Sequence, residues 1–208
     1  PIVDIPDVPE INITKSDGSK VPLDVERLAS LINDACDGLE DVFIGGAKGA
    51  SAGLFIQTRK GGFIRSDKID GDSDAASEDM GALFFDADGD KDMDLYVVSG
   101  GNEFEKSDPA LKDRLYINRG KGNFVKSKNC LPDFISSGSV VKAADYDNDG
   151  DQDLFVGGRV LPNEYPYAPN SYLLENNGKG VFKEVTESRA EGLKNIGMVS
   201  DALWTDFN

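Results

Sequence analysis

Residues 81–101 read GALFFDADGDKDMDLYVVSGG, and residues 141–159 read VKAADYDNDGDQDLFVGGR. In both stretches an apolar segment leads into a loop of alternating aspartates, and a second apolar segment then ends in paired glycines. The first aspartates, Asp86 and Asp145, are separated by about 60 residues, so the chain is built on an internal repeat of that length.

The other half of the repeat is also recognisable. The segments GLFIQTRKGGF, DRLYINRGKGNF and SYLLENNGKGVF end at Phe63, Phe124 and Phe182, and each is typical of two strands joined by a tight glycine turn. A degenerate copy of the acidic half, NDACDGLEDVFIGG, starts at Asn33, and a further copy starts within GMVSDALWTDFN at residues 197–208.

The repeat predicts an all-β protein made of β-propeller blades. Four strands in about 60 residues is the content of one blade. The segments 95–98 and 154–156 are apolar at every position, which indicates strands buried on both faces, as between two neighbouring blades. We expect about three four-stranded blades plus partial ends, within a seven-bladed or similar ring; a sandwich of short strands is the alternative.

The predicted boundaries follow the repeat. They are 1–66 for an N-terminal segment with a degenerate blade, 67–130 and 131–196 for two blades with acidic loops, and 197–208 for the start of a truncated blade. Residues 23–32 have the spacing of a short helix but also suit a degenerate outer strand. Because these blades do not close a ring, we expect a fragment of a longer chain or a ring completed by other copies.

The loop at residues 145–153 has the composition of a calcium site. Calcium binds six to eight hard oxygen ligands, and alternate carboxylates on a tight loop converge on one ion. Gly150 at the sixth position permits a sharp turn, and Asp151 at the seventh offers a main-chain carbonyl. The side-chain ligands predicted at positions one, three, five and nine are Asp145, Asp147, Asp149 and Asp153.

Three other segments carry the same pattern less completely. The loop at 86–94 offers Asp86, Asp88, Asp90, Asp92 and Asp94, but has Lys91 where the other loop has glycine. A non-glycine residue in a left-handed turn costs roughly 1 kcal/mol, which predicts a weaker or differently shaped site. A weaker ligand set is predicted at Asn33, Asp37 and Asp41. Asp206 and Asn208 are predicted as the first two ligands of a further loop.

The EF-hand is an alternative to this type of calcium loop. An EF-hand requires a bidentate glutamate at position twelve followed by a helix, whereas position twelve is Val97 or Val156 inside a strand-like segment. The acidic segment at residues 70–79 resembles a further site through Asp70, Asp72, Asp74 and Glu78, but no apolar strand follows it directly, so a solvated linker between blades is the favoured prediction.

Composition narrows the function. The 208 residues carry a formal charge of −16 and include no histidine. The charge disfavours binding to nucleic acid and to anionic membranes, and the missing histidine excludes His-dependent zinc sites and hydrolase triads. No apolar stretch is long enough for membrane insertion. Cys36 and Cys130 form one disulfide or remain as two thiols; the sequence does not distinguish these.

Together, these motifs resemble the FG-GAP/VCBS repeats, which include the calcium-binding blades of integrin α-chains. More narrowly, EDMGALFFDADGDKDMDLYVVSGGNEF, SYLLENNGKGVFKEVTE and GMVSDALWTDFN resemble VCBS proteins of Bacteroidetes linked to the ASPIC/UnbV domain. The resemblance covers residues 33–208. It implies a propeller, Ca²⁺ in the acidic loops, export to the cell surface or outside, and a role in adhesion or ligand binding, with Asp92 and Asp151 acting through main-chain carbonyls.

The expected function is therefore a non-catalytic binding module. A protein or glycan ligand would contact the variable segments starting at Asn102 and Arg159, with stacking on Phe104, Tyr165, Tyr167 and Trp204. Plain packing is the alternative role of these aromatic residues. The alternative function is an accessory or partial domain of a polysaccharide- or lipid-degrading enzyme.

Overall fold

The computed structural model describes residues 41–58, 61–69, 74–120 and 122–206, together with the backbone of two short strands, β1 (Asn12–Thr14) and β2 (Lys20–Pro22). The predicted helix at 23–32, the calcium ligands Asn33, Asp37 and Asn208, and Cys36 lie outside the described residues.

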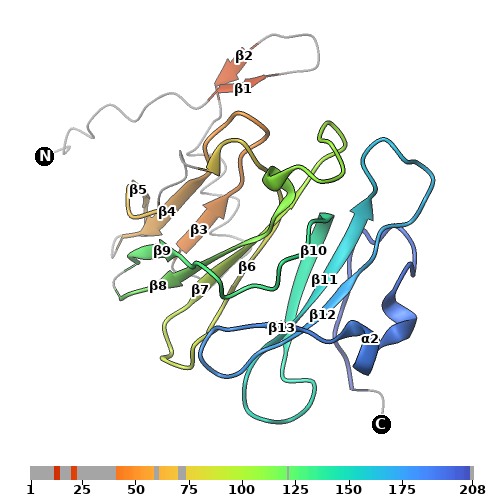
Figure 1. The fold of residues 1–208 in the computed structure, drawn as a ribbon. Coiled ribbons are helices and arrows are strands. Elements are labelled where there is room, and N and C mark those ends of the chain that lie inside the picture. Colours follow the sequence, from red (N-terminus) through yellow and green to blue (C-terminus); the bar gives the residue numbers. More distant parts are fainter. Residues whose placement is uncertain are drawn as a thin grey trace, which may run out of the picture.

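β1 and β2 pair with each other, and three larger antiparallel sheets then follow one another along the described chain (Figure 1). The first sheet contains β3 (Asp41–Ile44), β4 (Gly53–Gln57) and β5 (Phe63–Ser66). The second contains β6 (Glu78–Phe85), β7 (Asp94–Gly100), β8 (Arg114–Asn118) and β9 (Phe124–Lys126). The third contains β10 (Ser137–Ala144), β11 (Asp153–Val160), β12 (Tyr172–Glu175) and β13 (Lys183–Glu184).

In each sheet every strand pairs with the next one along the chain, so the three sheets have the same topology. Short helical turns lie at Pro109–Leu111, α2 (Thr186–Arg189) and Glu191–Leu193. The all-β prediction is confirmed, and three meandering sheets of three or four strands are consistent with β-propeller blades.

The core lies between the sheets, because the second strand of a sheet is buried on both faces. Along β7, Leu95 and Val97 pack in one cluster with Leu54 of the first sheet. Tyr96 and Val98 point the other way and pack with Leu154, Val156 and other residues of the third sheet. The prediction of strands buried on both faces is thus confirmed for β7, whose residues are all buried.

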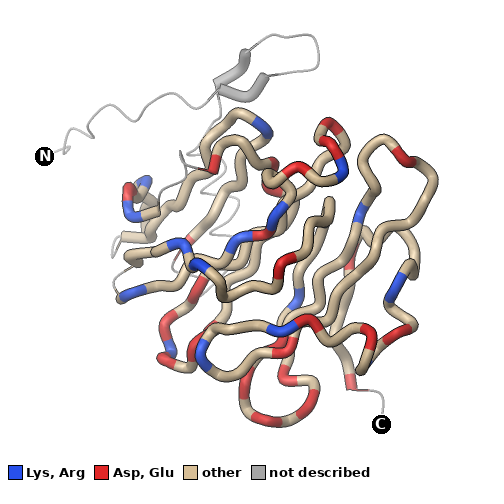
Figure 2. Tube along the Cα trace, in the orientation of Figure 1, with Lys and Arg blue, Asp and Glu red and all other residues tan. Residues whose placement is uncertain are grey.

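The loops that connect the strands lie at two opposite ends of the molecule. The β6–β7 and β10–β11 loops, which hold the alternating aspartates, lie at one end together with the β8–β9 and β12–β13 hairpin turns (Figure 1). The long β7–β8 and β11–β12 connections, residues 101–113 and 161–171, lie at the other end and are called the rim loops below. Figure 2 shows that acidic residues are concentrated in the aspartate loops.

The described part of the acidic segment, residues 74–79, is not the solvated linker that its composition suggested. Asp74 accepts hydrogen bonds from the Tyr116 hydroxyl and the Lys126 ammonium group, and its side chain is mostly buried. Asp79 accepts hydrogen bonds from the Gly46 N–H (2.8 Å) and from Arg114. These carboxylates are held by cations and donors of two sheets, which removes the repulsion that would keep the segment in solvent.

Residues 197–206 run along the third sheet next to β10. The Val199 N–H donates to the Gly158 carbonyl (2.9 Å), and the Ser139 hydroxyl donates to the Val199 carbonyl (2.7 Å). Further along, the Trp204 ring stacks on Tyr146, with 6.3 Å between ring centroids. This segment therefore reaches the same end of the molecule as the β10–β11 loop.

Candidate metal centre

The β6–β7 loop is folded by its own aspartates. Asp86 accepts the Gly89 N–H (2.8 Å) with one carboxylate oxygen and the Lys91 N–H (2.9 Å) with the other. Asp90 accepts the Asp92 N–H (2.9 Å). Short-range carboxylate-to-amide bonds of this kind replace regular secondary structure, which explains why a loop so rich in aspartate is tightly turned.

The β10–β11 loop repeats this arrangement. Asp145 accepts the Asp149 N–H and the Gly150 N–H, both at 3.1 Å, and Asp149 accepts the Asp151 N–H (3.0 Å). The repeat detected in the sequence is therefore also a repeat of loop conformation.

Both loops turn through left-handed backbone at positions four and six. These positions are Gly89 (φ 79°) and Lys91 (φ 73°) in the first loop, and Asn148 (φ 61°) and Gly150 (φ 98°) in the second. The expected strain at Lys91 is present in the structure. Each loop has one glycine and one residue with a side chain at these positions, and asparagine tolerates this region better than lysine.

The ninth-position carboxylate closes each loop against its sheet. Asp94 is fully buried and accepts the Ala87 N–H and the Asn118 N–H, both at 2.8 Å. Asp153 is also fully buried and accepts the Tyr146 N–H (3.3 Å) and the Asn176 N–H (2.8 Å). Each of these carboxylates therefore fixes the start of its loop to the end of the third strand of its sheet.

The degenerate copy keeps this feature. Asp41, the first residue of β3, accepts the Gln57 N–H (3.3 Å) at the end of β4. Asp41 thus has the same place in the first sheet as Asp94 and Asp153 have in the other two.

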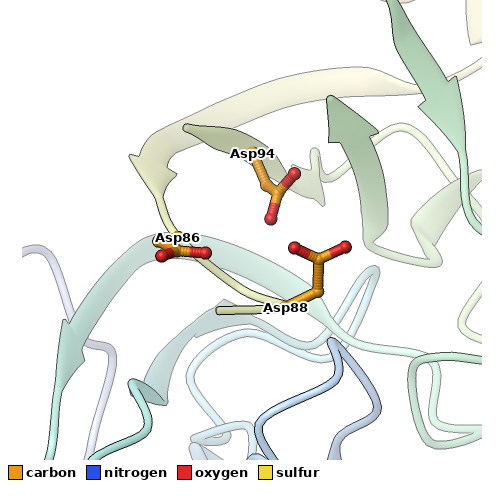
Figure 3. A group of neighbouring side chains, drawn as sticks. All are labelled: Asp86, Asp88 and Asp94. Atoms are coloured by element: carbon orange, nitrogen blue, oxygen red, sulfur yellow. The ribbon is translucent and has the colours of Figure 1, made fainter. Parts of the chain in front are cut away.

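Three carboxylates converge in each complete loop. In the first loop these are Asp86, Asp88 and Asp94, whose ligand atoms all lie within 4.8 Å of one another (Figure 3). In the second loop Asp145, Asp147 and Asp149 meet the same criterion and are exposed. Asp90 and Asp153, two of the predicted ligands, belong to neither group.

The chemistry of the first group fits a hard divalent cation. Within the described residues, Asp88 Oδ1 is a buried carboxylate oxygen that has no hydrogen-bond partner. Its other oxygen lies 3.7 Å from Arg119, a contact too long for a hydrogen bond. A buried carboxylate oxygen without a donor is unfavourable by itself, and a cation held by Asp86, Asp88 and Asp94 would satisfy it.

The electrostatics of the loops agree with this. Burial raises the pKa of Asp94 to about 6, although the two backbone N–H groups that it accepts act in the opposite direction. Burial also raises the pKa of Asp88 and of Asp153, and the charges of neighbouring aspartates add to each shift. Without a metal ion, the fold disfavours the ionised form of these carboxyl groups. The ionised form is the one that binds a calcium ion, and a bound ion would stabilise it.

The seventh-position aspartates face the hairpin turns of their own sheets. A Cβ placed on Gly178 would lie 2.6 Å from the Asp151 carboxylate oxygens, and one placed on Gly120 would lie 3.8 Å from Asp92 Oδ2. Because the side chains of Asp92 and Asp151 lie at these turns, we expect their main-chain carbonyls to be the groups that would coordinate a metal ion. Asp206 is exposed and stands at the first position of the further predicted loop.

The four aromatic residues considered for ligand stacking lie in different parts of the structure. Phe104 is buried, with 2% of its surface exposed, and lies beneath the Lys48 ammonium group at 4.1 Å from the ring centre. Trp204 lies at the opposite end, against Tyr146 of the second acidic loop. The remaining pair, Tyr165 and Tyr167, is 77% and 70% exposed on a rim loop.

Within the described residues, no helix is long and apolar enough to cross a membrane. Residues 99–156 match the family model of the FG-GAP-like repeat. This part of the chain is similar to an FG-GAP-like repeat. The matched region runs from the end of β7 to the middle of β11 and includes the converging group Asp145, Asp147 and Asp149. No curated protein matches the chain. FG-GAP-like repeats are typical of extracellular proteins and commonly bind calcium.

Proposed function

We propose that the chain is a calcium-binding β-propeller module of a secreted or cell-surface protein, which binds a protein or glycan ligand and catalyses no reaction. The observation that carries the metal assignment is the convergence of Asp86, Asp88 and Asp94 around a buried carboxylate oxygen without a donor. The equivalent loop of the third sheet, within the FG-GAP-like match, supports a second site.

Calcium suits these loops better than magnesium. Each loop offers several carboxylates and a main-chain carbonyl on an irregular turn, and calcium accepts six to eight such oxygens in irregular geometry. Magnesium requires near-octahedral coordination and retains several water molecules. The absence of histidine and the use of the carboxylates in metal-type spacing favour binding over catalysis.

The second loop can be tested through Trp204, the single tryptophan of the sequence. Its ring stacks on Tyr146, the residue between Asp145 and Asp147, so a Tb³⁺ ion in this loop lies near the ring. We expect tryptophan-excited terbium emission that excess Ca²⁺ abolishes and that falls severalfold in Asp147→Ala/Asp149→Ala. Trp204→Phe provides the antenna control. Emission that is unchanged in the double aspartate variant would show that the ion binds elsewhere.

The ligand surface is proposed on the rim loops. Contacts between them hold the backbone next to the two exposed tyrosines: Asn163 donates to the Asn102 side chain (3.3 Å) and to the Phe104 carbonyl (3.4 Å). Glu164 forms an ion pair with Lys106 at 3.1 Å. A braced loop that presents Tyr165 and Tyr167 loses little conformational entropy on binding, and tyrosine faces stack well on sugar rings.

We expect a glycan array to show binding by the wild-type protein and a loss of at least about tenfold in Tyr165→Ala/Tyr167→Ala, with an unchanged melting temperature because both side chains are exposed. Trp204→Phe, at the opposite end, should bind as wild type. Binding retained by the double tyrosine variant would move the ligand site away from this rim loop.

A further inference from the structure

The β12–β13 hairpin turn of the third sheet lies directly against the β6–β7 loop of the second. A Cβ built on Gly180 would lie 3.5 Å from Asp88 Cβ, and a Cβ built on Gly89 would lie 3.5 Å from the Gly178 carbonyl oxygen. The loop that holds one candidate metal site is therefore covered by the next sheet along the chain.

Asn176 makes the polar contact between these two elements. Its side chain is buried, and its Nδ2 group donates to the Ala87 carbonyl (2.8 Å) and to the Gln152 carbonyl (3.1 Å). Its Oδ1 accepts the Asn177 N–H (2.8 Å), and its own backbone N–H donates to Asp153 (2.8 Å). The hydrogen-bonding capacity of the Asn176 amide is thus used on three sides, which fixes its orientation.

The orientation of the Ala87 carbonyl affects the candidate metal site, because Ala87 lies in the chain between two of the converging carboxylates, Asp86 and Asp88. Its N–H is fixed by Asp94 from the same sheet, and its carbonyl is fixed by Asn176 from the neighbouring sheet. Together the two bonds fix the peptide groups on either side of Ala87 and hence the directions in which Asp86 and Asp88 project.

We propose that Asn176 is a positioning residue for the metal site in the β6–β7 loop, so that this site is completed only when the third sheet is packed against the second. The proposal rests on the proposed function, since it presupposes that the loop binds calcium. By linkage, a cation at Asp86, Asp88 and Asp94 then stabilises the contact between the two sheets. Removal of a residue that orients a metal ligand typically lowers the affinity for the metal 10–100-fold.

The experiment isolates the first loop and then removes the contact. In the whole chain, Asp147→Ala/Asp149→Ala disables the second loop, and calorimetric titration with Ca²⁺ measures the first. Adding Asn176→Ala is expected to weaken calcium binding by roughly 10–100-fold. Thr186→Ala is the matched control: Thr186, the first residue of α2, is buried and accepts the Leu173 N–H of the third sheet, so its loss lowers stability without touching the loop.

The result expected is weak binding with Asn176→Ala and binding within twofold of the parent with Thr186→Ala. If Asn176→Ala is poorly folded by circular dichroism, Asn176→Ser removes the same contact to Ala87 with a smaller change in packing and is titrated instead. Unchanged affinity in the folded asparagine variant overturns the positioning role while leaving the metal assignment intact. A parent that binds no calcium overturns the assignment of a metal site to the first loop, and titration of the wild-type chain then tests the second loop.

Discussion

Calcium is expected to raise the melting temperature of the chain by roughly 10–20 °C relative to chelator. Two independent sites filled at about 100 times their dissociation constants contribute about 5 kcal/mol of stability. For a domain of this size each kcal/mol shifts the melting temperature by roughly 2–4 °C. Thermal denaturation followed by circular dichroism, in calcium, magnesium and chelator at one ionic strength, measures the effect.

Substitution of a ligand gives a signature that general destabilisation does not. Asp88→Ala and Asp147→Ala each remove one carboxylate from a crowded group, so in chelator the variants are expected to melt at or slightly above the wild-type temperature. In calcium they are expected to melt well below it, because each loses one site. Equal melting temperatures for the wild-type protein in calcium and chelator would refute the metal assignment.

The calcium effect should also depend on pH. The pKa of Asp94 is raised to about 6 in the metal-free fold, so folding favours its protonated form. The contribution of Asp94 to stability is therefore greatest below its unfolded-state pKa near 4 and is lost as the pH rises through 6. Calcium replaces the proton, so the difference between calcium and chelator should widen between pH 5 and pH 7.

The second large effect is expected at Asp79, which lies at the opposite end of β6 from the first acidic loop. The Asp79–Arg114 ion pair is almost completely buried, with side-chain exposures of 5% and 4%. Asp79→Ala leaves the Arg114 guanidinium buried without its carboxylate, while Arg114 Nε already has no partner among the described residues. Breaking a buried pair in this way costs about 3–5 kcal/mol. Urea denaturation in chelator measures the loss separately from calcium.

A double variant distinguishes the unpaired charge from lost packing. Asp79→Leu/Arg114→Met removes both charges and keeps apolar volume, so it should recover much of the stability lost in Asp79→Ala. Recovery should be incomplete, because the Gly46 N–H also loses its acceptor. A free energy of unfolding for Asp79→Ala within about 1 kcal/mol of wild type would show that the pair is solvated in the folded protein.

The sequence was informative where the determinants are local. The alternating aspartates, the glycines of the hairpin turns and the apolar segments at 95–98 and 154–156 predicted the strands, and each of these strands is present with the expected burial. The position of Lys91 in a left-handed turn could be inferred from alignment with Gly150 alone. Repetition supplied this information, because each unit is an independent copy of one pattern.

Contacts between sheets were not predictable in the same way. Asn176 and Ala87 are 89 positions apart, and nothing in either residue type indicates the hydrogen bond between them. Asp74 and Asp79 were assigned to a solvated linker because their partners lie on strands of other segments. The aromatic residues were grouped by chemistry, whereas topology placed Trp204 and the two exposed tyrosines at opposite ends.

Glycines in β6 and β7 of the second sheet allow a close approach to β10 of the third sheet. A Cβ on Gly100 would lie 2.6 Å from the Gly138 carbonyl oxygen, and one on Gly81 would lie 2.7 Å from the Ser139 carbonyl oxygen. Real Cβ atoms do not come this close, so larger residues at Gly81 and Gly100 would push β6 and β7 away from β10. We expect β9 and β13, the last strands of the two sheets, to stay in place. The angle between neighbouring sheets would then become smaller, and a closed ring of such sheets would need a larger number of them. In any closed ring built from this unit, these glycines would therefore help to set the number of sheets.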